Sequence, residues 1–97
     1  MSEVLHLNLH REFFSAIANK QKKIEYRRQS LHWRRRLEGR KYSVVRFRNG
    51  YRKDAPEMLV EFRGLRRYGR GQGAYYAILL GHILKLKRWQ RLRQRAT

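Results

Sequence analysis

Four charged residues within the first third of the chain carry the clearest potential chemistry. Alternation over residues 22–27 predicts a strand that places Lys23, Glu25 and Arg27 on one face, with Lys22 at the junction to a preceding helix. An acid flanked by bases stays ionised, so it can orient an arginine toward phosphate or accept a proton. From spacing alone, the favoured interpretation is an exposed ion pair that contributes little energy.

Positive charge dominates the composition. The 97 residues include 25 Lys and Arg against 7 Asp and Glu, a net charge of +18, and arginine outnumbers lysine by 18 to 7. Such self-repulsion is relieved by a polyanion, and arginine suits forked contacts to phosphate. We therefore expect a nucleic-acid partner, ahead of a membrane surface or an acidic protein. Phosphate contacts are common to RNA and DNA, so composition does not decide between them.

Aromatic residues are interleaved with the basic clusters, and an exposed ring beside an arginine can stack on unpaired bases. Tyr51, Tyr68 and Trp89 lie next to turns or the tail and are expected to be exposed, whereas Trp33 and Tyr42 are expected in the core. The predicted nucleic-acid contacts are Lys20, Lys22, Lys23, Arg27, Arg28, Arg34, Arg35, Arg36, Arg48, Tyr51, Arg52, Arg66, Arg67, Tyr68, Arg70, Lys87, Arg88, Trp89 and Arg91.

Hydrophobic periodicity predicts an α+β fold in which about five strands curl into a small barrel and two short helices cross one side. Ser30 is expected to cap the second helix, Asn19 to end the first in a left-handed conformation, and Gly81 to bend the last strand. The expected strands are residues 4–9, 22–27, 42–48, 57–63 and 74–86, the helices are 10–18 and 31–37, and a polar connection covers 64–73. Residues 1–84 would form the domain, and 85–97 a basic tail with weak helical character.

Several classes of function are disfavoured. The chain contains no cysteine, which excludes disulfides and thiolate sites, and its four histidines lack metal-ligand spacing, so we expect neither metal nor cofactor. No apolar run approaches the roughly 20 residues that span a bilayer, which predicts a cytoplasmic protein. Nothing in the sequence indicates an oligomeric state.

The string around Glu25 resembles the signature of the ASCH family, Gly-x-Lys-x-x-Glu-x-Arg. Lys22, Glu25 and Arg27 match it, and Lys20 stands where the family has glycine. The order of elements is also similar over residues 4–84. The resemblance implies a PUA-like β-barrel, a cleft lined by these three matching residues, and binding of RNA or modified nucleosides.

The resemblance leaves three functions open. RNA binding is the first. The second is an enzyme that uses Lys22, Glu25 and Arg27. A ribonuclease is favoured there over an N4-acetylcytidine amidohydrolase, because those amidohydrolases have threonine at the position of Glu25 and carry a further acid in a longer insertion. Residues 64–73 hold no acid. The third is an accessory polyanion-binding protein on ribosomes or DNA, which would need the arginine clusters and the tail but not the motif.

Overall fold

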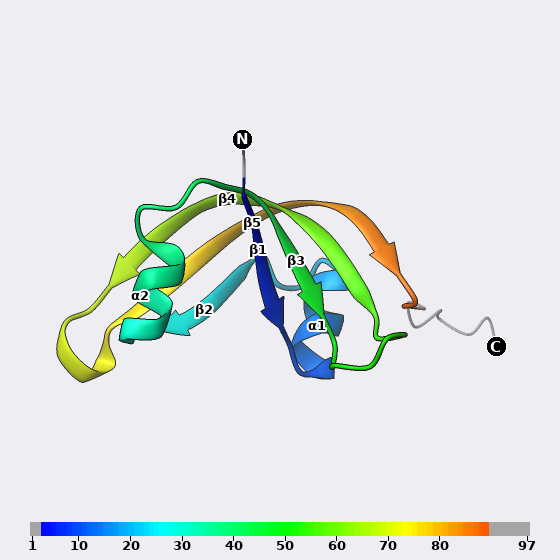
Figure 1. Cartoon of the computed structure of the whole chain (residues 1–97), viewed down its shortest axis with the longest axis horizontal. Coiled ribbons are helices and arrows are strands. Elements are labelled where there is room, and N and C mark those ends of the chain that lie inside the picture. Colours follow the sequence, from blue (N-terminus) through cyan, green and yellow to red (C-terminus); the bar gives the residue numbers. More distant parts are fainter. Residues whose placement is uncertain (1–2, 90–97) are drawn as a thin grey trace.

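The computed structural model describes residues 3–89 and confirms a small, barrel-like α+β fold with five strands and two short helices (Figure 1). The elements in chain order are β1 (Glu3–Asn8), α1 (Arg11–Ala18), β2 (Ile24–Arg28), α2 (Leu31–Leu37), β3 (Tyr42–Arg48), β4 (Glu57–Tyr68), a short 3-10 turn (Gly71–Gly73) and β5 (Tyr75–Lys87).

The five strands form one mixed sheet in the order β1-β3-β4-β5-β2. β1 runs parallel to β3 and the other neighbours are antiparallel. The sheet curves into a half-barrel, arched by the long strands β4 and β5, and both helices lie on its concave side (Figure 1). We call this concave side the inner face and the opposite side the outer face.

The arch follows from register shifts where β4 crosses β5, between Leu59 and Gly64. Extra residues in one strand bend a ladder and increase its twist. The bend predicted at Gly81 is confirmed, because this residue lies within the shifted region. A Cβ atom there would lie 2.4 Å from Nε of Arg63, so glycine allows that side chain to cross the strand.

Alternating apolar residues of every strand except β2 line the inner face and form the core. Leu5 of β1, Phe47 of β3, Val60 of β4 and Ile78 of β5 are each fully buried there. Helix α1 adds Phe14, Ile17 and Ala18, and α2 adds Leu37. On β2 the inward position opposite Ile78 holds a carboxylate, Glu25, so the core has a polar margin at this edge.

Strand β4 is longer than predicted, and β5 is shifted by one residue toward the C-terminus. β4 continues to Tyr68 through five residues assigned to a polar connection, because Leu65 packs against the core and the segment pairs with β5. β5 extends to Lys87, so the predicted domain boundary at residue 84 falls inside a strand. Tertiary pairing thus overrides weak local alternation.

The turn after α1 also differs from the prediction. Asn19 is not left-handed, with φ of −88°, and Lys20 takes that conformation instead, with φ of 62°. The backbone N–H groups of Gln21 and Lys22 both donate to the carbonyl of Ala16, at 2.8 and 3.1 Å. These bonds close the turn and hold a lysine in a conformation that favours glycine.

Residues 90–97 lie outside the described part of the chain, so the expectations for Arg91 and for a helical tail beyond Trp89 are not placed. Within residues 3–89, no helix is long and apolar enough to cross a membrane. The same residues contain no group of three or more His, Asp or Glu side chains arranged to hold a metal ion.

Candidate nucleic-acid interface

Glu25 lies at the centre of a buried charge cluster on the inner face of β2. Its side chain is 4% exposed, Nζ of Lys22 lies 2.7 Å from one carboxylate oxygen, and Arg27 donates to the other. The predicted alternation of β2 is correct, but the charged face points inward, toward Ile78 and Tyr76 of β5. The expectation of an exposed ion pair is therefore wrong.

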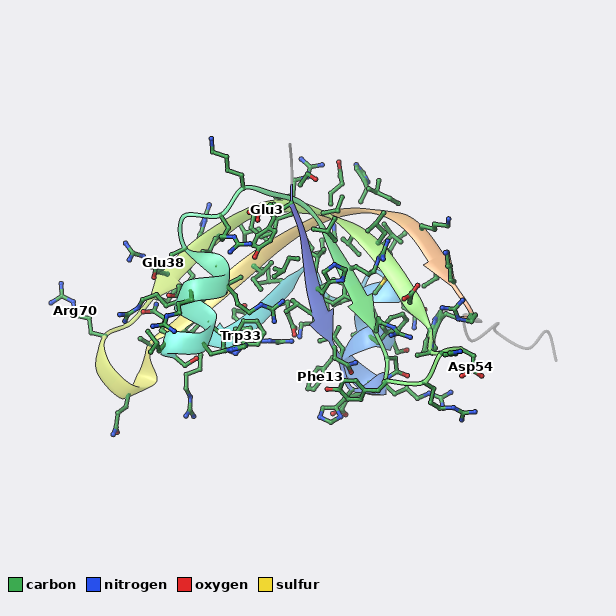
Figure 2. The ribbon with its side chains drawn as sticks, viewed as in Figure 1. Glu3, Phe13, Trp33, Glu38, Asp54 and Arg70 are labelled. Atoms are coloured by element: carbon green, nitrogen blue, oxygen red, sulfur yellow. The ribbon has the colours of Figure 1, made fainter. Side chains whose placement is uncertain are left out.

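Aromatic side chains extend this cluster to both helices. Nζ of Lys22 lies 4.7 Å from the ring centroid of Phe13 on α1, and the guanidinium of Arg27 lies 5.2 Å from the ring of Trp33 on α2. Arg36 lies over the same indole at 5.2 Å. Figure 2 labels Phe13 and Trp33 on the two helices that flank the open side of the half-barrel. The inner cluster comprises Phe13, Lys22, Glu25, Arg27, Trp33 and Arg36.

The inner cluster holds three cations against one acid. Arg36 donates to the backbone carbonyl of His6 at 2.8 Å, which ties α2 to β1. Cation–π contacts and the central carboxylate fix the positions of Lys22 and Arg27. Excess positive charge with defined geometry suits an anionic ligand better than it suits a structural ion pair.

A basic groove lies between the turn after α1 and the bent half of β5. It has a volume of about 780 Å³, within the range of small-ligand sites. No acidic residue of the described chain lines it. Two acids contact its lining residues from behind. Glu61 accepts from Arg63 at 3.2 Å and from the His82 amide at 2.8 Å, and Glu25 lies 2.7 Å from Nζ of Lys22. The polar lining consists of Lys20, Lys22, Lys23, Arg63, His82 and Lys85, and the apolar lining of Ile17, Leu80, Ile83, Leu84 and Leu86.

Only one motif residue belongs to this groove. Lys22 lines it, whereas Glu25 and Arg27 lie deeper on the inner face and contact Lys22 and Trp33 instead. Lys20 and Lys23, both predicted to bind nucleic acid, join Lys22 at the groove. Lys22 thus connects the inner cluster with the surface that a ligand can reach.

Other predicted contacts are already paired with acids. Arg48 and Arg88 both pair with Glu57, at 3.2 and 3.4 Å, and Arg88 also donates to a backbone carbonyl. Arg52 pairs with Asp54 at 3.4 Å on an exposed loop. Such side chains can still reach phosphate, but part of their charge is neutralised.

Arg67 belongs to a second polar cluster on the inner face, 3.5 Å from Glu38. Glu38 also accepts a hydrogen bond from the buried hydroxyl of Tyr76. Burial raises the pKa of Tyr76 above its ordinary value of 10.0, and the hydrogen bond to Glu38 raises it further. This cluster joins the end of α2 to β5.

The remaining predicted residues divide between distant parts of the fold. Arg34 and Arg35 are exposed on the last turn of α2, where positive charge complements the helix dipole. Tyr51 is 88% exposed in the β3–β4 loop. The β4–β5 hairpin, at the other end of the arch, carries Arg66, Tyr68 and Arg70, with Arg28 beside it on β2 (Figures 1 and 2). Lys87 is exposed at the end of β5.

Trp89 is not the exposed platform that was expected. Its ring lies 5.1 Å from Phe14 and packs against the core, and the guanidinium of Arg11 lies 5.9 Å from the ring centroid. A large apolar ring next to a core residue gains more from burial than from exposure. The position of Trp89 next to the tail gave no indication of this packing.

Several residues of these surfaces were not predicted from the sequence. Arg63, His82 and Lys85 line the groove because the β4–β5 bend brings them together, which no local pattern indicates. Tyr26 and Tyr75 are 50% and 39% exposed on the outer face. Their exposure can be predicted only once the charged face of β2 is assigned to the inner face of the sheet.

These geometric features are the basis for any functional conclusion. A scan against protein-family models and searches of curated proteins and of solved structures gave no match for this chain.

Proposed function

We propose that this chain is a cytoplasmic RNA-binding domain whose basic groove contacts the phosphate backbone. The groove is the observation that carries the proposal. It gathers four lysines, an arginine and a histidine with no acid of the described chain in its lining. Concentrated positive charge in a concave surface attracts a polyanion and releases its condensed counterions.

The distribution of acids supports this proposal. Among the described residues, six of the 7 acids already pair with bases, in eight ion pairs. Within residues 3–89, Lys20 and Lys23 form no such pair. Their charge has no partner in the described fold and remains available to a ligand. The resemblance to the ASCH family and the exposed tyrosines favour RNA over DNA.

The inner cluster favours binding over catalysis. A general base must reach the proton that it abstracts, but both carboxylate oxygens of Glu25 face cations. Glu25 therefore serves best to position Lys22 and Arg27. The ribonuclease alternative predicts that RNA is cleaved, and that Arg27→Lys and Glu25→Gln abolish cleavage while the proteins stay folded by circular dichroism.

The test compares binding of labelled single-stranded RNA, duplex RNA and duplex DNA over a salt series, with intact and cleaved RNA resolved on the same gel. The variant Lys20→Gln/Lys23→Gln removes two groove cations. The matched control Lys41→Gln/Lys53→Gln removes the same charge from exposed positions outside the groove.

We expect the groove variant to lower RNA affinity and to reduce the slope of log K against log salt by about 0.7 for each lost phosphate contact. The control should have a smaller effect. Equal losses in the two variants would indicate a diffuse polyanion surface, and equal affinity for RNA and DNA duplexes and for single-stranded RNA would contradict an RNA preference.

A further inference from the structure

Three tyrosines lie side by side on the outer face, across β2, β5 and β4. Tyr68 is directly opposite Tyr75, and Tyr26 is opposite Ala77, the next residue of β5 on that face. Ring centroids are 5.3 Å apart for Tyr68 and Tyr75, at 19°, and 5.7 Å apart for Tyr26 and Tyr75, at 70°. Tyr26, Tyr68 and Tyr75 are 50%, 41% and 39% exposed, and together form the tyrosine platform.

The backbone beneath the platform is held by Gln29. Its side-chain amide donates to the carbonyls of Tyr75 at 2.9 Å and Tyr68 at 3.4 Å. Its backbone N–H donates to the carbonyl of Ala74 at 3.0 Å. One residue thus joins the end of β2 to both strands of the hairpin, so the rings are supported before any ligand arrives.

Two arginines flank the rings on the same face. Arg28 is directly opposite Tyr75, and Arg66 is opposite Ala77 and two residues before Tyr68. Neither forms an ion pair with an acid of the described residues. A shallow hollow of about 280 Å³ adjoins the rings, lined by Tyr26, Arg27, Arg28, Gln72, Gly73, Ala74 and Tyr75.

Cross-strand tyrosine pairs stabilise many sheets, and this alone would account for paired rings. It does not account for two uncompensated cations beside them. Aromatic faces take any base by stacking, and adjacent arginines take the phosphates of the same strand. Along its length a duplex offers no free base face to such a surface, because its bases are stacked on one another.

We propose that the tyrosine platform stacks unpaired bases of single-stranded RNA, with Arg28 and Arg66 on its phosphates. This inference rests on the proposed RNA-binding function and adds to it a second surface, at the hairpin end of the outer face. It makes the domain selective for unpaired strands.

The test measures fluorescence anisotropy with three probes: a short oligouridine, the same strand with alternate bases removed, and duplex RNA. The variants are Tyr26→Ala, Tyr68→Ala and Tyr75→Ala, each with its matched Tyr→Phe variant, which keeps the ring. Leu31→Ala, a change in an apolar side chain that is 59% exposed on α2 and has no assigned role in binding, is the control.

We expect each alanine variant to lower affinity for oligouridine about fivefold or more, with the salt slope unchanged, because stacking involves no counterion release. The phenylalanine variants and Leu31→Ala should retain wild-type affinity. Binding of the base-depleted strand and of the duplex should respond less to every tyrosine change.

Each alternative outcome is distinct. Salt-sensitive RNA binding that all three alanine variants retain would overturn the platform and leave the proposed function intact. Failure of the wild type to bind any probe would overturn both. A dimer in sedimentation analysis that becomes monomeric in Tyr75→Ala without loss of RNA affinity would reassign the platform to contact between copies.

Discussion

Strand β2 contributes to both the inner cluster and the tyrosine platform, but its charged side chains are buried on the inner face and exposed on the outer face. On the inner face, Glu25 is buried and both of its oxygens contact cations. On the outer face, Tyr26 and Arg28 alternate with these residues, and the rings and the guanidinium face solvent. We therefore expect substitutions of inward-facing residues of β2 to lower the free energy of unfolding, and substitutions of outward-facing residues to weaken RNA binding.

The largest loss of stability is expected for Glu25→Gln. It leaves Lys22 and Arg27 close together without their shared anion, in a site that is largely excluded from water. We expect the free energy of unfolding to fall by about 3 kcal/mol in urea titrations. Asp54→Asn, which removes a carboxylate from an exposed pair with Arg52, is the control and should leave the midpoint unchanged. Equal effects would remove the distinction between the two faces.

Tyr76→Phe should have the next largest effect, because it removes the buried donor to Glu38. We expect a loss of about 1.5 kcal/mol at neutral pH. The pH dependence adds a second readout. Since the pKa of Tyr76 is raised in the fold, its stabilisation is complete below pH 10.0 and is lost as pH rises through the folded pKa. In alkali, the free energy of unfolding of the wild type should therefore fall more steeply with pH than that of Tyr76→Phe. Parallel pH profiles of the two proteins would contradict a buried Tyr76 hydroxyl.

Ser30→Ala removes the N-cap of α2, whose hydroxyl accepts from the Trp33 amide at 3.2 Å. A loss of about 1 kcal/mol is expected from thermal unfolding. Because α2 supplies Trp33 and Arg36 to the inner cluster, the indole fluorescence should also change. Ser43→Ala, on an exposed position of β3, is the matched control. If neither Ser30→Ala nor Ser43→Ala changes the stability in thermal unfolding, α2 is held by packing alone.

The smallest effect on stability is expected for Arg28→Gln/Arg66→Gln, which should change the unfolding free energy by less than about 0.5 kcal/mol. Binding should nevertheless weaken, with the salt slope for single-stranded RNA reduced by about 0.7 for each phosphate contact. Anisotropy titrations at several salt concentrations measure both quantities. A clear loss of stability without a change in slope would assign these arginines to the fold.

Much of the fold was predictable from local pattern. Period-two alternation located β1, β2 and β4, β-branched and aromatic residues located β3, and a long apolar run located β5. The Ser30 cap located α2, and Gly81 indicated the bend. The length of β4 beyond Arg63 was not predictable, because Leu65 is its one core residue there and pairing with β5 determines the rest.

The candidate site was predictable only as a set of residues. The motif spacing singled out Lys22, Glu25 and Arg27, and the structure brings them together. Alternation cannot say which face of an edge strand is inward when one face is charged and the other aromatic. The groove depends on Arg63, His82 and Lys85, which meet only through the bend in the long strands.

Strand order also determines at which stage of synthesis the groove and the tyrosine platform can form. β1, β3 and β4 are consecutive neighbours in the sheet and can pair as soon as β4 has been synthesised, whereas β2 has β5 as its hydrogen-bonded neighbour and must wait for it. Non-local pairing of this kind is slow and comes late in folding. The inward placement of Glu25, the groove and the tyrosine platform all require β5. A growing or truncated chain that ends before this strand has 19 of the 25 basic residues but cannot form the groove or the tyrosine platform, so the proposed recognition requires synthesis to pass the last strand.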